Sequence, residues 1–190
     1  ATDIVANVER ATGIIKHVRD FARQSEVVRS KVDINAPIRD VFKVLGHRIK
    51  VHKIDLQLDL TEDLPPIMAE HNRLEQVFIN LVTNAIDTLD EKAHGTPPGK
   101  VEQRLRIATF LEDGLVTVTV ADTGMGMSEA VKGKIFEPFY TTKKTGKGTG
   151  LGVSISYGII KDYDGRIRIE SAVGEGTTFI LKFPPVQADL

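Results

Sequence analysis

Five segments of the chain alternate apolar and polar residues with a period of two, the pattern of strands that are buried on one face. They cover residues 53–60, 104–108, 115–121, 166–170 and 178–183. Turn signals at Glu112-Asp113-Gly114 and Gly174-Glu175-Gly176 predict hairpins between neighbouring strands. A shorter strand is expected at 31–34. Together these strands predict a mixed, mainly antiparallel sheet.

Helical spacing of apolar residues predicts helices at 36–45 and 72–92, and a third that runs from a glycine-rich segment to about Tyr163. The apolar stripe of the second helix consists of Leu74, Val77, Phe78, Leu81, Ala85 and Leu89. A few helices on one face of such a sheet give an α+β fold, a two-layer sandwich.

The first 28 residues predict a separate long N-terminal helix. Its apolar residues lie four and three positions apart in turn, the spacing of helices that pack in bundles. They are Ile4, Val8, Ala11, Ile15, Val18 and Ala22. One interpretation places this helix on the core of its own domain. Because no other long helix of matching pattern lies nearby, we favour a dimerisation helix at 1–28, followed by a domain at 31–186.

The composition is that of an ordinary soluble domain, and it excludes several functions. The chain has 25 basic and 26 acidic residues, so its overall charge attracts neither nucleic acid nor an anionic membrane. It has no cysteine, which excludes disulfides, thiolate catalysis and cysteine-bound zinc. No apolar run is long enough to span a bilayer. We expect a cytoplasmic fragment of a longer protein, without nucleic-acid or membrane contact by the fragment itself.

The polar side of the helix at 72–92 carries two asparagines, Asn80 and Asn84, in line with Gln76, Asp87 and Glu91. Most polar helix faces are simply solvated. Asparagine is a poor helix former, however, and a plain surface would more naturally use glutamate, lysine or arginine. Amide oxygens at these positions suit a magnesium ion that is also held by phosphates and water.

Two glycine-rich segments indicate a nucleotide pocket. Asp122-Thr-Gly-Met-Gly-Met127 follows the strand at 115–121 and places a carboxylate beside room for a flat ligand. Gly146-Lys-Gly-Thr-Gly-Leu-Gly152 can wrap backbone N–H groups around phosphates. Either segment alone is weak support, because glycine clusters mark ordinary turns more often than ligand sites. Combined with the asparagines, they predict one nucleotide site.

Five motifs of this chain resemble the N, G1, F, G2 and G3 boxes of sensor histidine kinases, which belong to the GHKL superfamily. In chain order they are Asn80-Leu-Val-Thr-Asn84, Asp122-Thr-Gly-Met-Gly-Met127, Phe136-Glu-Pro-Phe-Tyr-Thr-Thr-Lys143, Gly146-Lys-Gly-Thr-Gly-Leu-Gly152 and Gly174-Glu-Gly-Thr-Thr-Phe179. The third motif is most similar to the nitrogen-regulation and dicarboxylate-sensing branch. The resemblance covers about residues 31–184 and implies a Bergerat-type ATP-binding fold.

The resemblance implies ATP and Mg²⁺ as ligands, and it implies a role for each matching residue. Asn80, Asn84 and Lys143 would form the catalytic set, with Asn84 coordinating Mg²⁺ and Lys143 near the terminal phosphate. Asp122 would accept the adenine amino group, assisted by a water on Thr177. The other expected ATP-binding residues are Asp87, Gly124, Gly126, Met127, Thr142, Gly146, Lys147, Gly148, Thr149, Gly150, Leu151 and Gly152. Residues from about 132 to 150 would form a mobile lid.

Some of these residues have simpler interpretations. Phe136 and Phe139 fit core positions as well as a lid-anchoring role. The lysines within 143–147 fit a solvated cluster, although their place among glycines favours phosphate binding. The related pattern usually has alanine after the acid at position 87, whereas this sequence has Thr88.

A histidine kinase also needs a phosphoacceptor histidine, normally on the first helix of a dimeric hairpin and followed by an acid. His17 precedes Val18 and lies in the helix that resembles the second one of that hairpin. We interpret it as a histidine that faces solvent or a partner. The resemblance therefore implies a homodimeric kinase whose acceptor histidine lies outside this sequence and whose phosphate passes to a response regulator receiver domain.

Two alternative functions remain. Gyrase, MutL and heat-shock chaperone relatives place a glutamate four residues before the magnesium asparagine to activate water. Here that position is Asn80, whose amide is not a useful base near neutral pH, so an ATP-hydrolysing machine is disfavoured. The other alternative is a degenerate nucleotide-sensing module, which no motif of the sequence favours.

Overall fold

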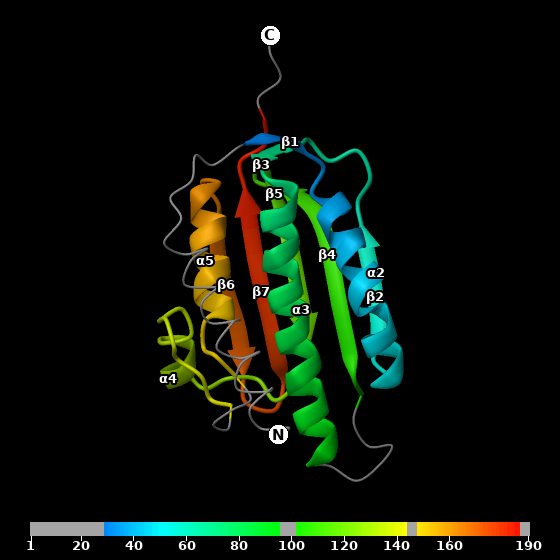
Figure 1. The fold of residues 1–190 in the computed structure, drawn as a ribbon, viewed down its shortest axis with the longest axis vertical. Helices are drawn as coiled ribbons and strands as arrows, with labels where there is room; N and C mark the ends of the chain where they lie inside the picture. The colour runs from blue at the N-terminus through cyan, green and yellow to red at the C-terminus, as the bar shows by residue number, and fades with distance from the viewer. Residues whose placement is uncertain (1–28, 96–101, 144–147, 187–190) are drawn as a thin grey trace, which may run out of the picture.

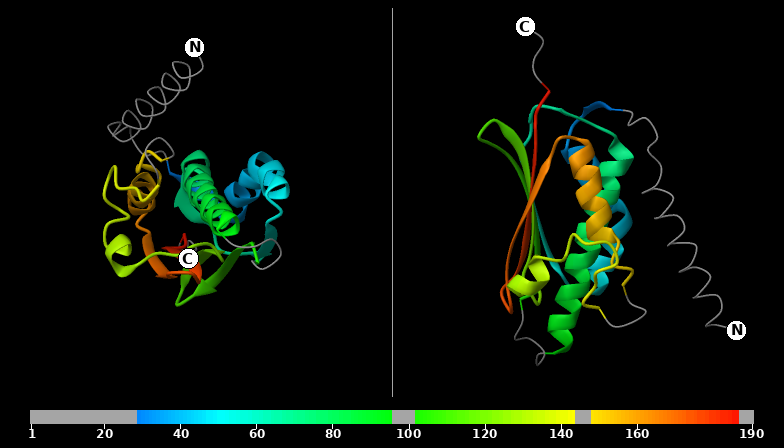
Figure 2. Two further views of the ribbon diagram at one scale, coloured as in Figure 1. Left: turned by 90° about the horizontal axis from the view of Figure 1, so that it is seen from below. Right: turned by 90° about the vertical axis from the view of Figure 1, so that its left-hand side faces the viewer.

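The computed structural model describes residues 29–95, 102–143 and 148–186. They form two layers, a five-stranded sheet and a set of helices on one of its faces (Figures 1 and 2). The predicted α+β sandwich is thereby confirmed. The predicted dimerisation helix at 1–28 lies outside the described residues.

The elements follow one another in a simple order. They are β1 (Ser30–Val32), α2 (Asn35–Val51), β2 (Asp55–Leu60), β3 (Ile67–Ala69), α3 (His71–His94), β4 (Arg104–Glu112), β5 (Leu115–Asp122), α4 (Glu129–Lys132), α5 (Gly152–Asp162), β6 (Arg166–Ala172) and β7 (Gly176–Phe183). Among the helices in these ranges, none is both long and apolar enough to cross a membrane.

The main sheet has the strand order β2-β4-β5-β7-β6. β2 runs parallel to β4, and the other neighbouring pairs are antiparallel. Both predicted hairpins are present. Between β4 and β5, Asp113 and Gly114 have φ angles of 52° and 75°, as a two-residue type I′ turn requires. The prediction of a mixed, mainly antiparallel sheet is confirmed.

The strand predicted at 31–34 is only partly correct. β1 does not join the main sheet but pairs with β3 in a separate two-stranded sheet. β3 is absent from the predicted strands, because three residues are too few to show a period of two. The helix predicted at 36–45 continues to Val51, and the strand predicted from residue 53 begins at Asp55.

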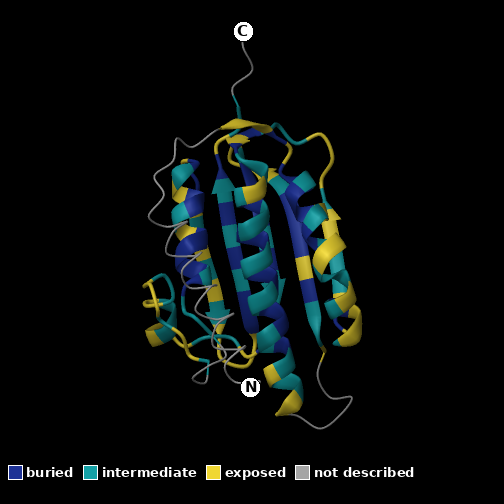
Figure 3. Cartoon of the chain, viewed as in Figure 1, coloured by how far each residue is buried: buried dark blue, intermediate teal, exposed yellow. Residues whose placement is uncertain are grey.

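α3 is the central helix, with α2 on one side of it and α5 on the other (Figures 1 and 2). Its predicted apolar stripe is buried throughout, against inward-facing strand residues such as Ile107, Val118 and Leu181. Figure 3 shows buried residues in dark blue along the strands behind α3. Burial of each such side chain contributes about 1.5–3 kcal/mol. This packing fixes the rotation of α3, so the line that carries Asn80 and Asn84 faces away from the core.

Candidate functional site

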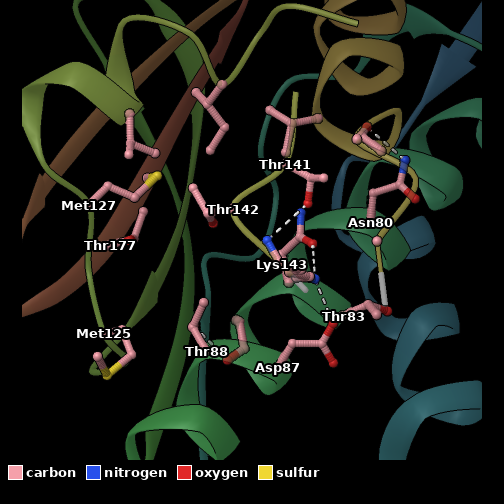
Figure 4. Close-up of a pocket in the computed structure, with 18 of the residues that line it drawn as sticks. Asn80, Thr83, Asp87, Thr88, Met125, Met127, Thr141, Thr142, Lys143 and Thr177 are labelled. Carbon is pink, nitrogen blue, oxygen red and sulfur yellow. Dashed lines mark hydrogen bonds and ion pairs between the residues drawn. The ribbon is translucent and has the colours of Figure 1, made fainter. Parts of the chain in front are cut away.

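A cavity of about 800 Å³ lies between α3, the end of β5, α4 and the start of α5. This volume falls in the range of small-molecule sites, about 300–1,000 Å³. Most predicted site residues line it: Asn80, Asn84, Asp87, Asp122, Gly126, Met127, Thr142, Lys143, Gly148, Thr149, Gly150, Gly152 and Thr177. Met125, Met127 and Thr177 lie on one side, whereas Asn80, Thr83 and Asp87 lie on the other (Figure 4).

The remaining predicted residues are placed differently. Leu151 is only 7% exposed and packs into the hydrophobic core, because the start of α5 directs its apolar side chain inward. Gly124 is not part of the cavity lining but lies next to Asp122, to which its backbone N–H donates a hydrogen bond of 2.8 Å. Gly146 and Lys147 lie outside the described residues.

Asp122 ends β5 with a carboxylate that is largely buried. Burial is the main influence and raises the pKa of Asp122 to about 6. Hydrogen bonds from Gly124, Thr88 and the backbone of Thr177, and the charge of Lys92, act in the opposite direction. A carboxyl group with a pKa raised by burial, placed in a cleft, is typical of a functional site.

Gly126 holds the loop after β5 against the β6–β7 hairpin. Its φ angle is +66°, and a Cβ atom there would lie 1.8 Å from the carbonyl oxygen of Ala172, so only glycine fits. The N–H of Met127 donates to Ser171 Oγ at 2.8 Å. The N–H of Gly174 donates to the carbonyl of Met125 at 2.7 Å. Asp122 is therefore followed by a loop with little freedom to move.

Asn80 joins α3 to the start of α5. Its Nδ2 donates to the carbonyl of Gly152 at 3.1 Å and to Ser156 Oγ at 3.2 Å. Just before this helix, Gly150 has a φ angle of +67°, and a Cβ there would lie 2.4 Å from the carbonyl carbon of Phe139. The glycine segment is thus held from both sides, by α3 and by the third motif.

Lys143 reaches from the third motif to α3. Its Nζ donates to Asp87 Oδ2 at 2.7 Å and to Asn84 Oδ1 at 3.2 Å (Figure 4). The other oxygen of Asp87 accepts from Arg48 on α2 at 2.6 Å. All three charged side chains are partly exposed. The amide oxygen of Asn84 is therefore directed at a cation.

The two phenylalanines of the third motif behave differently. Phe136 is partly buried, packs against the core, and its ring lies 5.0 Å from that of Tyr157. Phe139 is 65% exposed and has a φ angle of +67°. The core interpretation is therefore wrong for Phe139, whose backbone lies against Gly150.

Three residues without a predicted role lie at or beside the site, namely Thr88, Lys92 and Arg48. Lys92 Nζ donates to the carbonyls of Thr123 at 2.6 Å and Gly174 at 2.8 Å. Thr88 and Lys92 continue the steps of four that begin at Asn80 and Asn84, so the helical period was the available signal. Arg48 lies 39 residues before its partner Asp87, and no local pattern predicts that contact.

Residues 69–187 match the model of a family described as histidine kinase-, DNA gyrase B- and HSP90-like ATPases. The chain belongs to this ATPase family. The described domain is therefore an ATP-binding domain of the histidine kinase type, as the resemblance implied. The assignment to a nitrogen-regulation or dicarboxylate-sensing branch stays a prediction.

Two relatives within this ATPase family are sensor kinase CckA of Brucella abortus and sporulation kinase E of Bacillus subtilis. The chain is 37% identical to CckA over 187 residues, which cover 96% of the chain and 20% of CckA. It is 33% identical to sporulation kinase E over 181 residues, which cover 95% of the chain and 23% of that kinase. The chain thus spans about a fifth of the length of these relatives.

Solved structures of the ATPase family share the fold. The catalytic domain of histidine kinase ThkA matches with a TM-score of 0.68 and 32% identity, over 83% of this chain and 95% of that one. Full-length ShkA in complex with AMPPNP matches with a TM-score of 0.76 and 25% identity, over 100% of this chain and 39% of ShkA. ThkA in complex with the response regulator TrrA matches with a TM-score of 0.74 and 27% identity, over 96% of this chain and 49% of the matched one.

Proposed function

We propose that this chain is the catalytic domain of a two-component sensor histidine kinase. It passes the γ-phosphate of ATP to a histidine on a helix outside this sequence, for relay to a response regulator. The observation that carries this proposal is a single cavity that contains the Asp122 carboxylate, the Asn84 amide oxygen and the Lys143 ammonium. These three groups match the needs of an adenine, a magnesium ion and a phosphate.

The adenine end of the cavity fits the residues that line it. Asp122 offers a carboxylate acceptor for an exocyclic amino group, and Gly126 keeps the adjacent loop close to the β6–β7 hairpin. The side chains of Met125 and Met127 line this end of the cavity (Figure 4). Their polarizable thioether groups pack well against a flat aromatic ring. Thr177 Oγ1 lies 3.0 Å from Ser171 Oγ, which fixes the hydroxyl that we assign to a bridging water.

The magnesium end is built around Asn84. In this structure its amide oxygen accepts from the Lys143 ammonium, which stands where a cation would bind. One neutral oxygen is a suitable protein ligand for Mg²⁺, which prefers to keep several waters and to bind phosphate oxygens. Bound Mg²⁺ would supply charge neutralisation between the phosphates.

Lys143 and the start of α5 would hold the phosphates. α5 begins at Gly152 and has 11 residues, and residues 148–150 line the cavity just before it. Unpaired N–H groups and the helix dipole favour an anion at such a helix start. On ATP binding, the Lys143 ammonium would leave the Asp87 carboxylate and pair with the terminal phosphate, because both groups are anions. Transfer then depends on positioning and charge neutralisation, which is most of what phosphoryl transfer asks of a protein.

The hydrolytic alternative is disfavoured by the contacts of Asn80. Both of its observed hydrogen bonds use the amide nitrogen as donor, toward α5. A carboxylate at this position would face the carbonyl oxygen of Gly152 and repel it. We infer that Asn80 positions the start of α5 and does not activate water.

The wider assignments follow from the same proposal. The relatives CckA and ThkA are named as kinases, and ThkA has been solved in complex with a response regulator. We therefore assign a cytoplasmic location, a receiver domain as partner, and homodimer formation through residues 1–28. The division of the chain into a helix at 1–28 and a domain at 31–186 belongs to the same assignment.

A complementation assay tests the proposal. The whole protein carrying Asp122→Asn keeps its acceptor histidine but loses ATP binding. We mix it with the wild-type chain and γ-labelled ATP, and we expect label on the whole protein and none on the chain. The chain carrying Asp122→Asn is the control and should transfer nothing. Label on the chain's own histidines, or release of free phosphate alone, would overturn the proposal.

A further inference from the structure

Thr88 lies one helical turn after Asn84 on α3 and lines the cavity. Its Oγ1 lies 3.0 Å from the carbonyl oxygen of Ala85 and 3.4 Å from Asp122 Oδ1. The contact to Ala85 limits the rotation of the side chain. The hydroxyl therefore stays beside the Asp122 carboxylate. Thr88 lies on the cavity side of the helix (Figure 4).

The approach of Thr88 to Asp122 depends on the glycine at position 124. A Cβ atom on Gly124 would lie 2.5 Å from Thr88 Oγ1 and 2.7 Å from Asp122 Oδ1. Without that atom, the backbone N–H of Gly124 donates to the same Oδ1 at 2.8 Å. Oδ1 therefore lies beside two protein donors, the N–H of Gly124 and the hydroxyl of Thr88, whose single hydrogen is shared between Asp122 Oδ1 and the carbonyl of Ala85. These contacts reduce the capacity of Oδ1 for a further hydrogen bond, which makes Oδ2 the better acceptor for a ligand.

We propose that Thr88 is a positioning residue for nucleobase recognition, whose hydroxyl holds Asp122 Oδ1 so that Oδ2 accepts from the amino group of a 6-aminopurine. This inference rests on the proposed function, because it needs a purine at Asp122. A purine with a 6-oxo group has an oxygen in place of the exocyclic amino group, and this oxygen has no hydrogen to give to Oδ2. Thr88 therefore contributes to the preference for adenine without contacting it.

The hydroxyl of Thr88 also influences the pKa of Asp122. The hydrogen bonds from Thr88, from Gly124 and from the backbone of Thr177 favour the ionised carboxylate, as does the ammonium of Lys92 on α3. They oppose burial, which raises the pKa of Asp122 to about 6. Loss of the Thr88 hydroxyl removes one of these influences, so the pKa of Asp122 rises further and ATP binding is lost at a higher pH.

Two variants of the chain separate the hydroxyl from the rest of the side chain. Thr88→Val keeps the shape and removes the hydroxyl, whereas Thr88→Ser keeps the hydroxyl and removes the methyl group. Affinities for Mg-ATP and for Mg-inosine triphosphate, which has a 6-oxo group, are measured by calorimetry from pH 5.5 to pH 8. We expect Thr88→Val to bind ATP about fivefold to tenfold more weakly at pH 7.5. Its inosine triphosphate affinity should change less than twofold, and Thr88→Ser should resemble the wild type.

The outcomes distinguish this inference from the proposed function. Equal losses for both nucleotides in Thr88→Val, or equal ATP losses in Thr88→Val and Thr88→Ser, would show a packing role and overturn the inference. An unchanged pH profile of ATP affinity in Thr88→Val would overturn it as well. If the wild type fails to bind ATP, or if Asp122→Asn binds it normally, the proposed function fails instead. Thermal unfolding without nucleotide checks that each variant is folded.

Discussion

The ammonium of Lys143 forms an ion pair of 2.7 Å with the carboxylate of Asp87. Both side chains line the cavity, and the contact joins the third motif to α3. The same lysine also reaches Asn84, the residue that we assign to Mg²⁺. Binding of Mg-ATP therefore has to draw Lys143 away from both of its present partners.

Asp87→Asn tests this exchange. The ion pair is partly exposed and is worth about 0.5–1 kcal/mol, which nucleotide binding has to overcome. We expect Asp87→Asn to bind Mg-ATP about twofold to fivefold more tightly, by calorimetry. Lys143→Met should bind about tenfold more weakly, because it loses a charged donor to phosphate. Lys50→Met, at an exposed position on α2, is the control. Weaker binding by Asp87→Asn would show that Asp87 itself contacts ATP.

The raised pKa of Asp122 predicts opposite effects of pH on folding and on binding. Its pKa is about 6 in the folded protein against 3.8 in the unfolded chain, so between these values the folded state binds more protons. This group therefore makes the nucleotide-free protein more stable as the pH falls from 7 through 6 toward 4. ATP binding needs the ionised form and weakens over the same range. Denaturant unfolding and calorimetry at pH 5 and pH 7.5 measure the two effects.

Asp122→Asn separates stability from function. The ionised, buried carboxylate costs the folded state on the order of 2 kcal/mol at pH 7.5, which an uncharged amide does not. We expect the variant to have a higher free energy of unfolding than the wild type at pH 7.5, and a smaller difference at pH 4.5. A variant that is less stable at both pH values would contradict the statement that burial of the ionised Asp122 carboxylate destabilises the folded state.

Glycine-to-alanine substitutions at two positions should have opposite effects. Gly126→Ala places a Cβ against the carbonyl of Ala172 at a positive φ angle, and we expect a loss of more than about 2 kcal/mol of stability together with loss of ATP binding. Gly158 lies within α5, with no atom within 4 Å of an added Cβ. Gly158→Ala should stabilise the protein by about 0.5–1 kcal/mol and leave ATP binding unchanged.

Asn80→Asp tests whether this amide is needed as a donor. The substitution places a carboxylate opposite the carbonyl of Gly152, and we expect a loss of about 1–3 kcal/mol in the free energy of unfolding. Ser156→Ala is the matched control, because it removes one acceptor of the Asn80 amide, together with the bond from Ser156 to Gly152, and leaves the bond from Asn80 to Gly152 in place. Neither variant should release free phosphate from ATP. Steady phosphate release by Asn80→Glu would revive the hydrolytic alternative.

Strong local periods explain which parts of the fold could be predicted. The main strands and α3 each bury one face, so their sequences show a period of two or of 3.6 residues. β3 is too short to show a period. β3 pairs with β1, which lies far away in the sequence: Ser30 and Ala69, for example, are partners although they are 39 positions apart. Contacts of that kind leave no trace in local sequence.

The residues of the site also fall into those that local sequence predicts and those that it does not. The cavity positions of Asp122, Asn84, Gly126, Gly148, Gly150 and Gly152 were predictable because each motif needs particular residue types at short spacing. Arg48 reaches the site only through the packing of α2 against α3, and the contact of Thr88 with Asp122 depends in the same way on the packing of α3 against β5. The buried position of the Leu151 side chain was not predictable for a different reason. A glycine-rich motif predicts where the backbone lies, whereas the direction of an apolar side chain within it is decided by the nearby core.

Mg-ATP binding in the cavity, with Asp122 at the adenine end, is the basis of the proposed function. Calorimetric titration of Mg-ATP into the wild-type chain and into Asp122→Asn at pH 7.5 tests it. We expect one site per wild-type chain and an affinity lower by about two orders of magnitude in the variant. Absence of binding to the folded wild type, or equal affinity in Asp122→Asn, would show that Asp122 does not hold an adenine here.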